Sequence, residues 1–346
     1  MMSMVIAESE LHALAAGALA SLGVPPADAG DAAKILVLGD MFGLNTHGVS
    51  RVESYGERLR LGGIKACPSI RVEQVSPTVA KIDGDNGLGP LVGMRALEAA
   101  MAMARQQGTG IAFARASNHF GPVAPYLYLA TEQGFACIIG SNSTTTIAPT
   151  GGRDARLGNS PVGFAVPNPG GAPIMLDMAV SVVARAKIRA ALNRGETIPD
   201  TWATDKDGNK TTDPRAALDG FLLPIGGHKG YGLALIVDLF AGLLSGAAYL
   251  TRVKSWSDEP DQPQDLGHFF FLIDTRVLGD SAWLAARMAD FAAILHDTPP
   301  ADPARPVLLP GEIEMSNFVR QRRDGISIDA AVVDMLRKLA AGGPPI

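Results

Sequence analysis

The sequence predicts a mixed α/β (α+β) protein that begins with a helical lobe, and a change in hydrophobic periodicity is the main reason. Apolar residues recur with helical period over residues 11–22 and 32–41, and a third helix is expected over residues 47–60. Further along the chain, short β-branched runs alternate with alanine-rich helical segments. We therefore expect a helical lobe over residues 1–72 and a mixed α/β region over residues 73–325.

The elements of the second region follow from the same patterns. Strands are expected at residues 78–83, 110–115, 136–140, 163–167, 173–177 and 268–274, and helices at residues 90–107, 122–133, 180–193, 231–244 and 281–295. Turn residues predict a surface loop over 197–218, and Pro and acidic residues predict a mobile loop or subunit contact over 255–264. A last amphipathic helix, residues 328–341 within the segment 326–346, is expected to pack back on the N-terminal lobe.

Bulk composition narrows the classes of partner. The 346 residues are 47% hydrophobic and 19% charged, and such apolar chains often bury their remaining apolar surface between subunits, so an oligomer is expected. The net charge is −5 and the basic residues are dispersed, which argues against nucleic acid or an anionic membrane surface as a partner. A small molecule fits this charge distribution better.

Cysteine usage and the N-terminus indicate a location. Only two cysteines occur, Cys67 and Cys137, and both are expected to be buried, reduced thiols, so the cytoplasm is the default compartment. The apolar stretch 11–22 follows Glu8 and Glu10 rather than a basic segment, which argues against a signal peptide. No window reaches the roughly 20 uncharged apolar residues of a membrane span.

Polar, glycine-flanked segments interrupt this apolar background. They are residues 43–51, 117–121, 176–179, 226–232 and 309–313. Because His, Asp, Lys and Arg at such turns are typical of a site assembled from distant parts of a chain, this distribution indicates an enzyme.

The first segment combines an imidazole and a guanidinium. His47, Arg51, Tyr55 and Arg58 follow at spacings of four, four and three, so they share one helical face. Arginine binds a carboxylate with a bidentate fork, and histidine exchanges a proton near neutral pH, which together suit a 2-oxo acid. The alternative is a histidine near a helix cap beside a row of solvated arginines.

Two further segments carry candidate catalytic groups. His119 lies in a loop between a strand and a helix, where α/β proteins place ligands, although it could simply cap the next helix. Asp177 ends an apolar strand, where its carboxylate could orient a histidine or bind a ribose hydroxyl. It could equally cap the helix that follows.

The glycine-rich segment 226–232 predicts an anion site. His228 and Lys229 stand before an apolar helix, so backbone N–H groups, the positive helix end and the lysine all favour a phosphate over a merely flexible turn. A G-x-G-x-x-G fingerprint is absent, because Gly87, Gly89 and Gly93 have the wrong spacing. A dinucleotide would therefore not bind here in the usual Rossmann manner.

Taken together, these segments resemble the malate/L-sulfolactate/L-lactate dehydrogenase family, the type-2 malate/lactate dehydrogenases. The resemblance runs from about residue 32 to residue 315 and rests on Thr-His-Gly-Val-Ser-Arg, Ser-Asn-His-Phe-Gly, Leu-Asp-Met-Ala and Lys-Gly-Tyr-Gly-Leu-Ala in this order. It implies a non-Rossmann NAD(P)-binding fold with a large mixed, largely antiparallel sheet. It also implies NAD or NADP as cofactor and a homodimer with active sites near the subunit interface.

The resemblance also implies roles for particular residues. His47 is expected as the proton donor and Arg51 as the carboxylate clamp, while His119 acts as proton acceptor in some members of the family. The residues that fall where the family contacts the dinucleotide are Ser143, Asp177, Met178, Ala179, Lys229, Gly311, Glu312 and Ile313. Thr46 replaces a serine of many members, and residues 121–126 depart from the family pattern, so the substrate stays open.

Several alternatives remain at this point. The leading function is hydride transfer between nicotinamide and C2 of a small 2-hydroxy/2-oxo acid, and reduction of a cyclic imino acid such as Δ1-piperideine-2-carboxylate is the main alternative.

A basic group among Arg153, Arg156, Lys187 and Arg189 would select NADP. A metal-dependent hydrolase or lyase using His47, His119, Asp177 or His228 is more remote, because no pair has H-x-x-x-H spacing. No metal is therefore expected. A nucleotide-binding protein without catalysis is the last alternative.

Overall fold

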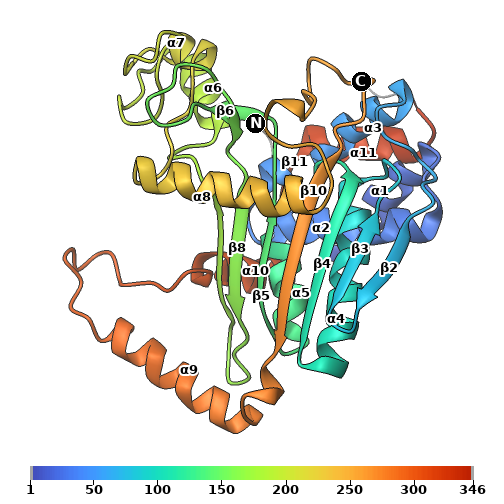
Figure 1. Cartoon of the computed structure of the whole chain (residues 1–346), viewed down its shortest axis with the longest axis vertical. Coiled ribbons are helices and arrows are strands. Elements are labelled where there is room, and N and C mark those ends of the chain that lie inside the picture. Colours follow the sequence, from blue (N-terminus) through green and yellow to red (C-terminus); the bar gives the residue numbers. More distant parts are fainter. Residues whose placement is uncertain (1–2, 344–346) are drawn as a thin grey trace.

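A seven-stranded mixed sheet forms the centre of the computed structural model, which describes residues 3–343. Only β3 and β4 pair in parallel, and the other neighbours are antiparallel. The predicted mixed α/β architecture is confirmed. In spatial order the strands are β2 (Arg71–Ser76), β3 (Val79–Asp83), β4 (Thr109–Ser117), β10 (Leu266–Asp274), β5 (Phe135–Ser141), β8 (Pro161–Val166) and β9 (Ile174–Ala179) (Figure 1).

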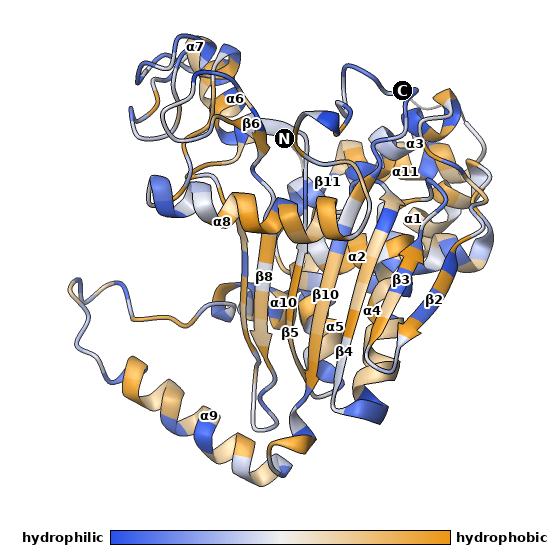
Figure 2. Cartoon of the chain, in the orientation of Figure 1, coloured by the Kyte–Doolittle hydropathy of each residue, from blue (hydrophilic) through white to orange (hydrophobic). Residues whose placement is uncertain are grey.

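Helices cover the two faces of the sheet unequally. On one face α4 (Gly89–Gln107) packs on β4 and β10, and α5 (Ala124–Glu132) packs on β5 and β8. On the other face α8 (His228–Asp238) and the π-helical turn Leu239–Leu244 cross the sheet near one end. Below α8 the apolar strands β5 and β8 face the viewer without a covering helix in Figures 1 and 2.

The N-terminal segment forms helices, and the second α-helix packs against α4 and α5. The helices are α1 (Glu8–Ser21), α2 (Pro26–Met41), the 3₁₀ turn η1 (Asn45–His47) and α3 (Arg51–Leu61). The C-terminal helix α11 (Ala330–Ala340) packs on α1, and β1 (Ser3–Ile6) pairs with β11 (Ile326–Asp329). One buried apolar cluster runs through these helices and into the sheet. The division at residue 72 stays a prediction, and residues 1–2 and 344–346 lie outside the described part.

A second, smaller apolar cluster lies beneath α8. Around it are β6 (Thr145–Ile147), β7 (Leu157–Gly158), α6 (Arg185–Arg194) and α7 (Pro214–Asp219). The helix predicted from residue 180 begins only at Arg185, because residues 180–182 pair with residues 223–225 instead. The predicted surface loop 197–218 contains α7, whose first turn is capped by Asp213. Similarly, the predicted last helix is preceded by β11, which takes up Ile328.

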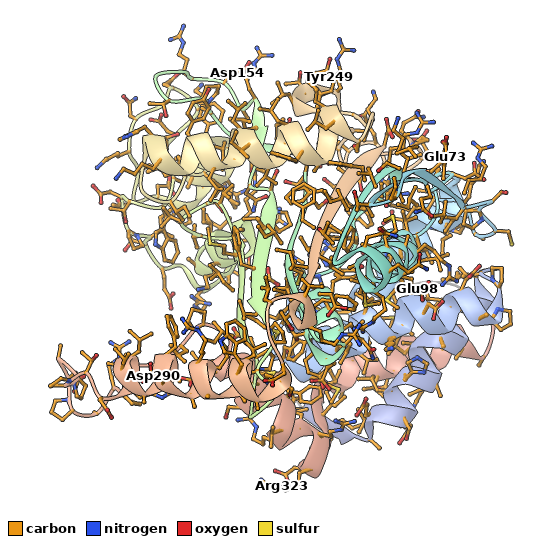
Figure 3. The ribbon with its side chains drawn as sticks, turned by 60° about the horizontal axis from the view of Figure 1, so that its bottom comes forward. Glu73, Glu98, Asp154, Tyr249, Asp290 and Arg323 are labelled. Atoms are coloured by element: carbon orange, nitrogen blue, oxygen red, sulfur yellow. The ribbon has the colours of Figure 1, made fainter. Side chains whose placement is uncertain are left out.

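Helix α9 (Ser281–His296) extends away from the rest of the chain as an arm (Figures 1 and 3). The chain reaches it from β10 through the 3₁₀ turn Thr275–Val277 and returns through an extended segment to α10 (Glu312–Asp324). Met288 is the one residue of α9 that is buried, while Trp283, Phe291 and Ile294 are exposed. None of the described helices combines the length and apolar composition of a membrane span.

Candidate active site

The turn that carries His47 is held by a buried carboxylate. Asp40, in the last turn of α2, accepts a hydrogen bond from the Val49 N–H at 2.7 Å. Gly48 passes so close to Asp40 that a Cβ atom would lie 2.2 Å from the carboxylate, and therefore only glycine fits there. Burial raises the pKa of Asp40 to about 7, opposed in part by the bond from Val49.

Arg51 and His47 are both anchored to Thr46. The Arg51 Nε donates to the Thr46 carbonyl at 2.7 Å, and the Thr46 hydroxyl lies 2.9 Å from Nδ1 of His47. The remaining guanidinium nitrogens are left to face a cleft of about 530 Å³. This cleft is lined by Thr46, Ser50, Arg51, Glu53, Ser54, Glu57, Arg60 and, from α6, Ala186.

The segment that carries His119 follows β4 and is fixed on both sides of the histidine. The Asn118 amide donates to the Gly87 carbonyl at 2.9 Å and to Asn86 Oδ1 at 3.0 Å. Beyond the histidine, the Tyr126 hydroxyl donates to the Phe120 carbonyl at 2.6 Å. The His119 backbone is therefore immobilised by elements of the buried core.

The structure brings His47 and His119 together. Their rings stack with centroids 5.6 Å apart and planes inclined by 29°. Burial, reinforced by the positive charge of Arg51, lowers the pKa of His47 to about 4 and that of His119 well below its usual range. Both rings are thus neutral at pH 7 in the free protein, beside a guanidinium that can bind an anion.

Two donors determine the tautomer of His119. The Tyr55 hydroxyl lies 2.8 Å from Nδ1 of His119, and the Gly121 N–H donates to the same nitrogen at 3.4 Å. The Tyr55 hydroxyl also lies 3.2 Å from the His119 carbonyl, to which it can donate instead. An N–H group can donate only to a lone pair, so the Gly121 contact indicates that Nδ1 is unprotonated, and Tyr55 then donates to Nδ1 over the shorter distance. We therefore assign the proton of neutral His119 to Nε2.

Trp256 closes one side of the pair. Its ring meets His119 edge to face at 5.6 Å and Tyr55 at 5.5 Å. The buried guanidinium of Arg58 stacks on Trp256 at 4.7 Å and donates to backbone carbonyls of Trp256, Glu259 and Gln262. The loop 255–264, predicted to be mobile or a subunit contact, is thus tied to the site by Arg58, which does not face substrate.

The predicted cofactor residues gather along β9. At the C-terminal end of this strand Ala179 pairs with Pro161. The N–H of the next residue, Val180, donates to the Asn159 carbonyl, and its carbonyl accepts from the Ile225 N–H. Ser143 reaches the same place, because its hydroxyl donates to Asn159 at 3.4 Å. Ile225 leads directly into the predicted anion turn before α8. Met178 lies between these contacts and is half-buried.

The predicted anion turn combines two glycines of positive φ with the start of a helix. Gly226 and Gly227 have φ of 57° and 62°, a left-handed conformation that favours glycine, and His228 begins α8. His228 and Gly227 line a cleft of about 460 Å³ together with Arg153 and the 148–152 loop. Lys229 is exposed beside it.

Gly311, Glu312 and Ile313 lie at the opposite end of β9. The Met175 N–H donates to the Pro310 carbonyl at 3.0 Å, so the start of α10 flanks this strand. The carboxylate of Glu312 is already engaged, because it accepts from the Leu309 N–H at 2.9 Å and lies 2.8 Å from Nε2 of His296. Ile313 is exposed.

Asp177 contacts neither catalytic histidine in the described part of the chain. Its carboxylate accepts from the Ala124 N–H at 2.8 Å, at the start of α5, and burial raises its pKa to about 6. It caps the helix that follows His119 in the sequence, rather than the helix after its own strand. Its place on β9 leaves a contact with the cofactor as a prediction.

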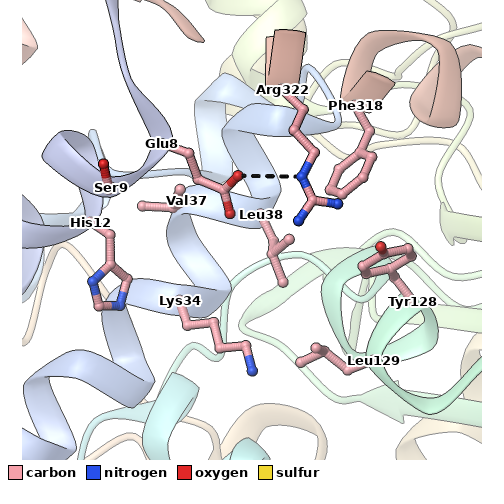
Figure 4. A pocket seen from close by; sticks show the side chains of 10 residues that line it. All are labelled: Glu8, Ser9, His12, Lys34, Val37, Leu38, Tyr128, Leu129, Phe318 and Arg322. Atoms are coloured by element: carbon pink, nitrogen blue, oxygen red, sulfur yellow. Dashed lines mark ion pairs between the residues drawn. The ribbon is translucent and has the colours of Figure 1, made fainter. Parts of the chain in front are cut away.

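Two other features lie outside this arrangement. The described residues contain no group of three or more His, Cys, Asp or Glu positioned to hold a metal ion, so the metal-dependent alternative has no ligand set among them. A hollow of about 610 Å³ lies among α1, α2, α5 and α10, where Glu8 and Arg322 are 3.8 Å apart (Figure 4). Its lining includes none of the predicted site residues.

Comparison with known proteins identifies the family of this chain. The model of the malate/L-lactate dehydrogenase family matches residues 6–337. The chain belongs to this family. Membership confirms the resemblance and the predicted class of enzyme, an NAD(P)-dependent oxidoreductase acting on a small hydroxy acid, and matched relatives are named for NAD(+) as well as for NADP(+).

Individual relatives span the expected chemistry. The structure of sulfolactate dehydrogenase from Methanocaldococcus jannaschii has a TM-score of 0.89 at 35% identity, covering 98% of this chain and 97% of that one. The (2R)-3-sulfolactate dehydrogenase (NADP(+)) of Chromohalobacter salexigens is 33% identical over 98% of this chain and 99% of its own. The structure of Δ1-piperideine-2-carboxylate reductase from Pseudomonas syringae has a TM-score of 0.88 at 29% identity, covering 97% and 99%.

Proposed function

We propose that this enzyme transfers hydride between the nicotinamide and C2 of a small 2-hydroxy/2-oxo acid at the His47–His119 pair. The observation that carries the proposal is the stacked pair beside Arg51, whose guanidinium is free to bind a substrate carboxylate. The bound reduced nicotinamide supplies the hydride for C2. The protein holds the carboxylate, keeps the carbonyl oxygen near the imidazoles and provides the proton.

In this proposal His47 is the proton donor and His119 a hydrogen-bond donor. Protonation of His119 would place a hydrogen on Nδ1, against the Gly121 N–H, and would require the Tyr55 hydroxyl to turn to the His119 carbonyl at 3.2 Å. Protonation of His47 meets no such obstacle, because the Thr46 hydroxyl can accept from its Nδ1–H. Burial is the larger cause of the lowered pKa of His47 and the Arg51 charge the smaller one, and a substrate carboxylate on Arg51 offsets the second of these.

The dinucleotide is proposed to lie along β9 on a non-Rossmann frame. Two residues of this segment bond to the flanking elements: Met175 bonds to Pro310, and Val180 bonds to Ile225. Met175 and Val180 are five residues apart, which corresponds to about 16 Å of strand. That span suits an extended dinucleotide between the start of α10 and the anion turn. The residues that would hold it are Ser143, Asp177, Met178, Ala179, His228, Lys229, Gly311, Glu312 and Ile313.

A cyclic imino acid is the second candidate substrate. The likeness to Δ1-piperideine-2-carboxylate reductase supports it, and a C=N bond next to a carboxylate needs the same clamp and proton donor. The test follows the absorbance of NADH and NADPH over pyruvate, oxaloacetate, sulfopyruvate and Δ1-piperideine-2-carboxylate. Turnover of a linear oxo acid supports the leading proposal, turnover of the imine alone replaces it, and cofactor binding without any turnover contradicts both.

A homodimer in the cytoplasm completes the proposal. The apolar residues Phe291 and Ile294 are exposed on the arm α9, and Phe164 and Val166 are exposed on one face of β8. Such paired apolar surfaces are typical of permanent subunit contacts. Both cysteines are free thiols, which fits a reducing compartment. Cys137 is buried as predicted, whereas the prediction was wrong for Cys67, which is exposed.

A further inference from the structure

A buried histidine outside the substrate cleft links the two halves of the site. His268, on β10, has no solvent exposure, and both of its ring nitrogens bond to serine hydroxyls. Nε2 lies 2.7 Å from Oγ of Ser117 and Nδ1 lies 2.8 Å from Oγ of Ser141. These serines end the strands β4 and β5, which flank β10 on its two sides.

The direction of these hydrogen bonds follows from the serine at the end of β5. The Ser141 hydroxyl donates to the carbonyls of Asn142 at 2.9 Å and Gly267 at 3.2 Å, so its oxygen accepts from Nδ1–H of His268. The Nε2 atom then carries a lone pair and accepts from the Ser117 hydroxyl. Burial keeps this imidazole neutral by lowering its pKa to about 3, so the chain of bonds does not reverse with pH.

Each serine leads directly into one side of the site. Ser117 is two residues before His119, and Ser141 is two residues before Ser143. The His268 ring also stacks on Phe120, the residue after His119, with centroids 4.4 Å apart and planes inclined by 6°. The His268 side chain thus contacts Ser117 and Phe120, the residues on either side of the Asn118-His119 segment. It also contacts Ser141, at the end of the strand that leads to Ser143, the predicted cofactor contact.

We propose that His268 is a positioning residue that holds the His119 segment in register with the Ser143 segment through the Ser117–His268–Ser141 hydrogen bonds. Its role rests on the proposed function of His119. A displacement of His119 by a fraction of an ångström lowers the probability that substrate and imidazole reach the geometry for reaction. Binding of the substrate and of the cofactor depends on other contacts. The expected signature is a fall in kcat without a matching rise in KM.

Substitutions of His268 can distinguish a positioning role from a packing role, because some of them retain only one of its two hydrogen bonds. His268→Gln can place an amide nitrogen or oxygen near the position of Nε2 and keep the bond to Ser117, and His268→Asn can do the same near Nδ1 for Ser141. His268→Phe keeps the stack on Phe120 and removes both bonds. We expect kcat to fall at least tenfold in His268→Phe and to recover partly in His268→Gln, more than in His268→Asn.

The serines provide a milder test should the histidine variants not fold. Ser117→Ala and Ser141→Ala should each lower kcat about tenfold with an unchanged Kd for the reduced cofactor. Leu272→Val is the control, because Leu272 is buried on the same strand and face. It should lower Tm and leave kcat unchanged.

The outcomes distinguish this inference from the proposed function. Activity, Tm and NADPH fluorescence titrations are measured on all variants together with His119→Ala. Loss of activity in His119→Ala with normal kcat in Ser117→Ala and His268→Phe would overturn the positioning role alone. Full activity in His119→Ala would instead remove the proposed role of His119, on which this inference rests, and kcat losses that simply follow Tm would reduce His268 to a packing residue.

Discussion

The phenol oxygen of Tyr55 lies 2.8 Å from Nδ1 of His119, although 64 residues separate the two. The bond joins α3 of the N-terminal helices to the loop after β4. Burial raises the pKa of Tyr55, so the phenol stays protonated and donates at all working pH values. The proposed catalytic pair, His47 and His119, is therefore assembled across two parts of the fold. The tautomer of His119 depends on a residue one helical turn beyond Arg51, the proposed carboxylate clamp.

Tyr55→Phe should release the tautomer of His119 while leaving the fold intact. We expect kcat to fall about tenfold, because only the weaker Gly121 donor would remain at Nδ1. Nitrogen-15 NMR of the histidine rings should show a mixture of Nδ1–H and Nε2–H forms. Tyr249→Phe, which removes a phenol oxygen elsewhere in the chain, serves as the control. A single Nε2–H form in Tyr55→Phe would show that the phenol does not set the tautomer.

His47→Ala should abolish turnover and leave binding of the reduced cofactor nearly intact. The imidazole provides the proton for the substrate oxygen, but the predicted dinucleotide contacts lie along β9. Steady-state rates and a fluorescence titration with NADPH and NADH measure the two effects separately. Activity within roughly tenfold of wild type would exclude His47 as the acid, and the assignment would then move to His119.

Arg51 has two separable effects, on the carboxylate and on the pKa of His47. Arg51→Lys keeps the charge but loses the bidentate fork, so KM should rise with little change in the pKa of His47. Arg51→Gln removes the charge as well, and the pKa of His47 should then rise from about 4 by only part of the shift, because burial, the larger cause, remains. NMR titration of His47 in both variants checks this difference. An unchanged KM in Arg51→Lys would eliminate the clamp.

Asp40 should make stability fall as pH rises. Its pKa is 3.8 in the unfolded chain and about 7 in the fold, so the folded state binds the proton more tightly. The stabilisation is fully present below pH 4 and is lost as pH rises to about 7. Asp40→Asn does not titrate but can still accept from Val49. Its free energy of unfolding, relative to wild type, should therefore increase between pH 4 and pH 7, and a pH-independent difference would contradict the shift.

Residue patterns predicted much of the site but little of its support. His47, Arg51 and His119 were recognisable because a rare polar group stands in an apolar, glycine-rich context. Periodicity likewise predicted the buried helices. The polar strand β2 and the exposed helix α10 were missed, because surface elements carry little apolar alternation or stripe.

The supporting residues were missed for a different reason. Asp40 and His268 lie inside predicted regular elements, and the sequence shows no sign that their side chains reach Val49, Ser117 or Ser141. Trp256 lies in a loop whose path depends on three carbonyls that Arg58 binds. Contacts between segments about 100 residues or more apart depend on the sheet order, which local patterns do not determine.

The arm α9 offers the last prediction, on assembly. Phe291 and Ile294 are 52% and 64% exposed on a helix that contributes only Met288 to the buried residues of its own chain. If a second copy covers them, Ile294→Glu buries a charge in the contact and should shift the protein from dimer to monomer in light scattering after size-exclusion chromatography. Val5→Glu, at an exposed residue of β1, is the matched control and should leave the mass unchanged. A monomeric wild-type protein would contradict the dimer, and a dimeric Ile294→Glu variant would place its interface away from the arm.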